Sequence, residues 1–255
     1  MLASTLALGA AARAEVTPLR PIVPDGSQVD EPAVEAQIVG RANAFRATNG
    51  LAALRQQAQL TDEARRFAGF LAGASMFSHT ADGHTPSERA EAAGYAWCEV
   101  AENIAYEKDP AAVTADMLAA RFVDGWERSP EHRKNLLNAD VEETGVGVAT
   151  STLRRSTHFA VQVFGRPLSR QFGFEIVNRS GTEVRYAYDS ERQKIAPHLV
   201  ITYTACSPRE LSFDSPPVAG QATFRPDRPV IYELKKLDRA VVVETRPVTS
   251  AKGGA

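Results

Sequence analysis

The sequence predicts an α+β protein with a mainly helical first part and an all-β second part. Apolar residues recur at helical spacing from Ala33 to about residue 138. From Thr144 the pattern changes to β-branched and alternating runs, which are typical of strands. After Pro167, seven short strand-like runs follow one another with turn residues between them. Such spacing is typical of a small antiparallel sandwich.

The N-terminus precedes any of these elements. Residues 1–14 are short and apolar and end in Ala12-Arg13-Ala14, the small-x-small pattern of a signal-peptidase site. They predict export to the periplasm or the exterior. Residues 15–32 contain four prolines and are expected to form a linker.

Local signals place five helices. The first should run from Ala33 to Gly50, and the second should begin at Thr61 as N-cap, with a buried stripe of Ala64, Phe67, Ala68 and Leu71. Thr85-Pro86-Ser87-Glu88 is a capping box that opens a short helix closed by Gly94. The last two should begin at Asp109-Pro110 and Ser129-Pro130 and end near Trp126 and Asn138.

The remaining elements are strands. Two are expected at residues 144–149 and 158–164. The domain boundaries that follow are 33–167 for the first domain and 170–246 for a small β domain, with a tail at 247–255. The seven runs of the β domain are FGFEIVN, EVRYAY, HLVITYTA, RELSF, QATF, VIYEL and AVVVE.

Composition excludes several classes of protein. The 255 residues include 29 Lys+Arg and 31 Asp+Glu, a net charge of −2, and 44% are hydrophobic. This balance is that of a globular chain and gives no basic surface for nucleic acid. No stretch of the mature chain approaches the roughly 20 apolar residues that span a bilayer.

Several ordered motifs carry a resemblance to a known family. They are Phe77-Ser78-His79, Asp82-Gly83-x-Thr85-Pro86 with Arg89, Gly94-Tyr95, Glu102-Asn103-Ile104-Ala105, Trp126, Ser129-Pro130-Glu131-His132-Arg133, Thr144-Gly145-Val146-Gly147-Val148 and Gln162-Val163-Phe164. In order and spacing they resemble the bacterial branch of the CAP superfamily, the cysteine-rich secretory, antigen 5 and pathogenesis-related proteins. The resemblance covers residues 36–166 and implies an α-β-α sandwich, followed here by the β domain.

The resemblance also implies a cleft with two histidines and two acids. His79 matches the first histidine and Glu102 the first acid. The position of the second acid is occupied by Ser129, which is flanked by Glu127 and Glu131. His158 is one residue out of register with the second histidine, and a slip of one residue turns a side chain to the other face of a strand. The bacterial branch carries a histidine in its Ser-Pro-x-His-Arg segment, so the resemblance implies His132 as the second imidazole. The expected ligand-binding residues are His79, Glu102, Asn103, Ser129, Glu131, His132 and Gln162.

Two interpretations of this cleft remain open. His79, His132 and one carboxylate would suit zinc, or another divalent metal such as magnesium, as cofactor. In the second interpretation, Glu102 and the two imidazoles only form hydrogen bonds within a polar cleft. Ser129 is explained as an N-cap, and no Gly-x-Ser-x-Gly elbow is present, so a Ser-His protease is a minority hypothesis.

Export would permit the two cysteines of the chain to form a disulfide. A Cys98–Cys206 disulfide would join the two domains, and two buried thiols are the alternative; we expect the bridge. The expected function is binding of a lipid-like, cell-envelope or protein ligand through the cleft, with no firm catalytic residue. The alternative is a hydrolase in which Glu102 with His79 or His132 activates water, with or without metal.

Overall fold

The computed structural model describes residues 29–74, 76–108, 113–151, 153, 157–215 and 217–248. The expected signal peptide, most of the expected linker and the end of the tail lie outside these residues. No helix in this part of the chain is both long and apolar enough to cross a membrane.

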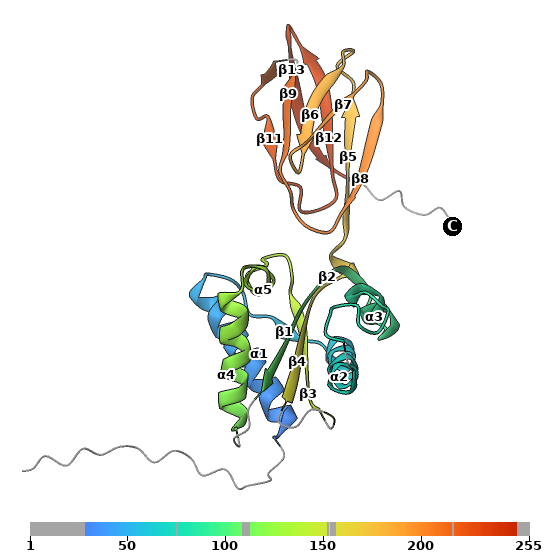
Figure 1. The fold of residues 1–255 in the computed structure, drawn as a ribbon. Coiled ribbons are helices and arrows are strands. Elements are labelled where there is room, and N and C mark those ends of the chain that lie inside the picture. Colours follow the sequence, from blue (N-terminus) through green and yellow to red (C-terminus); the bar gives the residue numbers. More distant parts are fainter. Residues whose placement is uncertain are drawn as a thin grey trace, which may run out of the picture.

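The first part of the chain is an α-β-α sandwich, as expected (Figure 1). Its central sheet has the strand order β1-β3-β4-β2, in which only β1 and β3 are parallel. One apolar core joins this sheet to α1, α4 and α5, and a second joins its other face to α2 and α3. In chain order the elements are α1 (Glu31–Thr48), β1 (Arg55–Gln56), α2 (Ala58–Gly73), α3 (Pro86–Ala92), β2 (Trp97–Lys108), α4 (Ala115–Arg128), α5 (Pro130–Leu136), β3 (Glu143–Thr150) and β4 (Thr157–Pro167).

The helix starts agree with the sequence where the signal is local. Thr85 forms both halves of the capping box with Glu88. Helix α1 begins at Glu31, with Asp30 as N-cap, two residues before the expected start. Thr61 is not the N-cap of α2, because the chain passes directly from β1 into the helix at Ala58.

The last two helices also differ from expectation in detail. Helix α4 begins at Ala115, where the Thr114 side chain accepts a hydrogen bond from the Met117 N–H. The expected start at Asp109-Pro110 lies outside the described residues. Ser129 is in the N-cap position of α5, but its side chain makes no capping hydrogen bond. Capping therefore does not account for the Ser129 hydroxyl.

Two glycines explain the Thr-Gly-Val-Gly-Val motif of β3. A Cβ atom at Gly147 would overlap the backbone of Ala64 and Arg65, and one at Gly145 would overlap that of Leu60 and Thr61. Helix α2 therefore lies directly on the backbone of β3.

We expect Gly147→Ala to lower the free energy of unfolding by about 1–3 kcal/mol, because α2 must shift to admit the methyl group. Chemical denaturation measures this difference. Gly69→Ala in α2, where an added Cβ meets open space, is the control and should stabilise the fold slightly. Equal stability of Gly147→Ala and the wild type would contradict this close packing.

The second part of the chain is a β sandwich. A sheet of order β10-β13-β12-β5-β8 packs on one of order β11-β9-β6-β7 around a shared apolar core. It is not wholly antiparallel, because β12 pairs with β5, and β10 with β13, in parallel. Strands β7 and β10 were not expected from the sequence. The strands are β5 (Phe172–Asn178), β6 (Val184–Tyr188), β7 (Glu191–Ile195), β8 (Val200–Ala205), β9 (Leu211–Ser215), β10 (Val218–Ala219), β11 (Thr223–Phe224), β12 (Val230–Leu237) and β13 (Ala240–Pro247).

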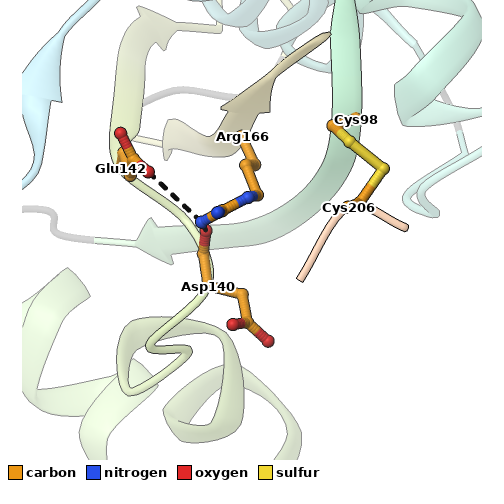
Figure 2. Close-up of a disulfide and its surroundings, with 5 residues drawn as sticks. All are labelled: Cys98, Asp140, Glu142, Arg166 and Cys206. Carbon is orange, nitrogen blue, oxygen red and sulfur yellow. Dashed lines mark hydrogen bonds and ion pairs between the residues drawn. A yellow bond between two sulfur atoms is a disulfide. The ribbon is translucent and has the colours of Figure 1, made fainter. Parts of the chain in front are cut away.

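A disulfide and ion pairs join the two parts. A short 3-10 turn, η1 (Leu168–Arg170), leads from β4 to β5, and the expected bridge links Cys98 of β2 to Cys206 after β8, with Cα atoms 5.6 Å apart (Figure 2). Arg209 of the β part forms an ion pair with Asp140 at 2.7 Å. Stable disulfides are typical of exported proteins, so the bridge indicates export.

Candidate functional site

The candidate site lies at the outer edge of β2. This strand is last in the sheet, and successive residues point to opposite faces. Glu102 lies opposite Val163 on the α2–α3 side, whereas Asn103 lies opposite Gln162 on the α1–α4 side. The edge of β2 thus brings side chains from both helical layers close together.

Glu102 forms a direct pair with His79. The His79 Nδ1 and Glu102 Oε1 atoms are 2.7 Å apart, and the Glu102 side chain is 1% exposed while that of His79 is 48% exposed. The other carboxylate oxygen, Oε2, accepts a hydrogen bond from Arg89 Nη2 at 2.5 Å. Both oxygens of Glu102 are therefore engaged, and His79 presents its ring at the surface.

Arg89 holds together four segments of the chain. Its Nε donates to Glu63 of α2 at 2.6 Å, and its guanidinium lies 3.5 Å from the centroid of the Phe67 ring. Its Nη1 donates to the carbonyl oxygens of His79 and His84 and to Asp82. Arg89 thereby fixes the loop that carries His79.

Asn103 organises the other face. Its Nδ2 donates to the His132 carbonyl at 3.1 Å, and its Oδ1 accepts from Asn135 at 2.9 Å. Asn135 also donates to the carbonyl of Glu102, so α5 is attached to the outer edge of β2. Gln162 is fully buried behind Asn103 and donates to Thr144.

His132 is half-buried on α5. Burial is the main cause that lowers the pKa of His132, the nearby His79 lowers it further, and Glu131 opposes the change. The imidazole is therefore biased toward its neutral form, which can both donate and accept a hydrogen bond.

A pocket of about 300 Å³ lies against His132. Its polar lining includes Ser129 and His132, whereas Glu102 and His79 lie outside it. The remaining wall is mostly apolar and aromatic, and the residues are Phe77, Ala105, Tyr106, Glu107, Arg121, Phe122, Gly125 and Trp126.

The structure brings the expected residues together unevenly. His79 contacts Glu102 directly, while Ser129 and His132 share the pocket. Glu131 is exposed and Gln162 is enclosed in the sheet. His158 is buried and contacts Thr150, in agreement with its exclusion from the cleft.

The described side chains do not form the expected metal site of His79, His132 and one carboxylate. Among the described residues, no group of three or more His, Cys, Asp or Glu side chains is placed to hold a metal ion. Arg89 and His79 occupy both oxygens of Glu102, the carboxylate nearest to His79. The site is better described as a polar network beside an apolar pocket.

Glu63 and the role of Arg89 were missed in the sequence. Glu63 is buried, and it lies within the apolar stripe of α2, three residues after Leu60 and four before Phe67. An acid in such a stripe indicates a buried charge that needs a partner. That signal was present, although nothing local identifies Arg89 as the partner.

Comparison with protein-family models finds a match in the first part of the chain. The model of the cysteine-rich secretory protein family, CAP, matches residues 39–164. No curated protein sequence matches the chain. Similar solved structures include an extracellular protein with an SCP domain from Bacillus anthracis, with 29% identity over 58% of this chain and 45% of that one and a TM-score of 0.46.

Two further bacterial structures are similar. An outer surface protein of Borrelia burgdorferi is 22% identical over 52% of this chain and 92% of its own, with a TM-score of 0.46. A cysteine-rich secretory protein of Staphylococcus aureus is 20% identical over 54% of this chain and 40% of its own, with a TM-score of 0.40. The chain thus spans less than half of the B. anthracis and S. aureus proteins.

The ordered motifs, the α-β-α sandwich and the match to the family model lead to one conclusion. Through residues 39–164, the chain belongs to the cysteine-rich secretory protein (CAP) family.

Proposed function

We propose that the protein is an exported binding protein that holds a lipid-like ligand, with an apolar chain and a polar end, in the pocket beside His132. The composition of that pocket carries the proposal. Buried Phe122 and Trp126 line it, while Phe77 and Tyr106 are partly exposed. Aromatic walls with a few polar groups, here Glu107, Arg121, Ser129 and His132, are typical of sites that bind apolar ligands and fix their orientation.

The size and polarity of the pocket limit the kinds of ligand that it can bind. About 300 Å³ is at the lower limit of ligand pockets, so it suits one acyl chain or ring rather than a large ligand. A neutral imidazole at His132 and the hydroxyl of Ser129 would hydrogen-bond to a carboxyl or hydroxyl end group. A ligand of this kind occurs in cell envelopes, and the β domain would then set the location or the partner of the protein.

The geometry supports a hydrolase with Glu102 as its base less well. Water activation by Glu102 needs a carboxylate oxygen free to accept a proton, and His79 and Arg89 occupy both. Glu102 is better placed to orient His79 than to act as a base.

Filling the pocket tests the proposal. Gly125 of α4 lines the pocket, and an added Cβ there meets no atom within 4 Å, so Gly125→Leu should block the pocket without breaking the helix. We expect the wild type to bind cis-parinaric acid, a fluorescent fatty acid, and Gly125→Leu to bind it at least about tenfold more weakly, a loss of about 1.4 kcal/mol.

Gly69→Leu is the matched control, since Gly69 is also a helical glycine with open space around its Cβ but lies outside the pocket. It should bind as the wild type does. Absence of binding by the wild type, or equal binding by Gly125→Leu, would refute the proposed site.

A further inference from the structure

One buried cation serves three carboxylates behind the cleft. Arg89 forms ion pairs with Glu63 at 2.6 Å, Glu102 at 2.5 Å and Asp82 at 3.1 Å. The side chains of Arg89, Glu63 and Glu102 are all nearly inaccessible to solvent. Negative charge therefore exceeds positive charge inside this network when all three acids are ionised.

Glu63 has fewer hydrogen-bond partners than Glu102 in this network. Its Oε1 accepts the bond from Arg89, but its Oε2 is buried and has no hydrogen-bond partner among the described residues. Both oxygens of Glu102, in contrast, have partners, and Asp82 is partly exposed. Burial is the main cause that raises the pKa of Glu63 to about 7, and the charge of Glu102 adds to it. An unpaired buried carboxylate oxygen has lost its water without replacement.

The His79 loop, residues 76–84, helps to cover this site. Arg89 lies between Glu63 and the loop, and it holds the loop by the carbonyl oxygens of His79 and His84 and by the Asp82 carboxylate. His79 then reaches from the same loop to Glu102. Glu63, Arg89 and the loop residue Asp82 line one pocket of about 330 Å³, whose other walls belong to α2 and α3. Movement of Arg89 or of this loop would therefore widen the access of water to Glu63.

We propose that the His79 loop is a proton-dependent cover, which stays closed while Glu63 is protonated and loosens when Glu63 ionises. Because the loop carries His79, the proton on Glu63 also determines how firmly one wall of the cleft is held. Glu63 and Arg89 lie outside the ligand pocket, although Phe77 of the loop lines it. The proposal does not depend on which ligand that pocket binds.

The direction follows from linkage. A carboxyl group that binds its proton more tightly when covered must favour the uncovered state once it is ionised. Closure is therefore strongest below the ordinary pKa of a glutamate and weakens as the pH rises through about 7. The charged groups around Glu63 are Arg66 on α2, Arg89 on α3, Glu102 on β2 and His79, Asp82 and His84 in the loop. Since two of these are histidines, a variant must isolate the effect of Glu63.

Amide hydrogen exchange measured at pH 6 and pH 8 tests the cover. In the wild type, we expect the protection factors of the His79 loop to fall by up to about tenfold between these pH values, the linkage limit for pKa values of about 7 closed and 4.5 open. In Glu63→Gln, which cannot ionise, that fall should disappear. Glu35→Gln is the matched control, because Glu35 is a buried acid of α1 that pairs with Arg65 at 2.6 Å. It should keep the wild-type fall.

Two further readouts make the result decisive. The core of β4, residues 159–164, should not change in parallel with the loop; an equal change in both would show global unfolding and refute a local cover. A carbon-13 titration of the Glu63 carboxyl needs no variant and should have its midpoint near pH 7. A midpoint below about 5, near the ordinary value for glutamate, or an unchanged fall in Glu63→Gln, would also overturn the proposal.

Discussion

Replacement of Arg89 by methionine is expected to lower the free energy of unfolding by about 3–5 kcal/mol. The substitution keeps an unbranched apolar side chain over Phe67 but removes the cation shared by Glu63 and Glu102. Breaking a buried ion pair from one side is costly because the remaining charge keeps its desolvation and loses its partner. The loss, measured by urea denaturation, should be smaller at pH 6 than at pH 8, since Glu63 can then take up a proton.

Two other variants separate charge from packing. Arg41→Met removes an ion pair with Asp116 whose side chains are 36% and 63% exposed, so it should cost less than about 1 kcal/mol. The double variant Arg89→Met, Glu63→Gln should regain about 1 kcal/mol or more, because one unpaired charge is removed with its partner. If Arg89→Met costs no more than Arg41→Met, the network does not stabilise the fold.

Elements with a local signal were predictable from the sequence. The capping box at Thr85 and the proline starts of α3 and α5 depend on residues within four positions of each other. The start of α2 was not predictable, because it depends on a contact between residues distant in sequence. The Gln57 N–H donates to the Thr144 carbonyl at 2.9 Å. That pairing extends the β1 edge to residue 57, and Thr61 instead donates its hydroxyl to the Gln57 carbonyl.

Strand β2 was missed for a related reason. Its sequence, WCEVAENIAYEK, does not alternate between apolar and polar residues, because both of its faces are covered and it carries Glu102 and Asn103. A strand that contains site residues can lack the alternation of apolar and polar residues by which strands are recognised. The resemblance identified Glu102 where periodicity could not.

The residues that match the family motifs were predictable, but the residues that support them were not. His79, Glu102 and His132 followed from the ordered motifs. The partner of Glu63 is 26 positions away in sequence and that of Glu102 is 13 positions away, and only the packing of α2, α3 and β2 brings them to one guanidinium. Nothing in the sequence indicated that Arg89 would bind the Glu102 carboxylate.

Removal of the disulfide by Cys98→Ser and Cys206→Ser together is the other change with a large expected effect. The bridge closes a loop with a sequence separation of 108, and a loop near 100 residues corresponds to about 4.7 kcal/mol in the chain-entropy model. We expect the free energy of unfolding to fall by nearly this amount, as measured by guanidinium denaturation. Wild-type protein unfolded under reducing conditions should match the double variant.

This expectation requires that both parts of the chain unfold together, because a cross-link that joins independently unfolding domains restricts neither of them. Arg209 supports joint unfolding: its ion pair with Asp140 spans the junction, and the bond to that carboxylate is the main cause that raises the pKa of Arg209. Arg209→Met tests this contact and, in the oxidised protein, should make the transition broader or split it in two. A double cysteine variant that loses less than about 1 kcal/mol while keeping a single transition would contradict the chain-entropy account, because the bridge would then span parts already held together in the unfolded state.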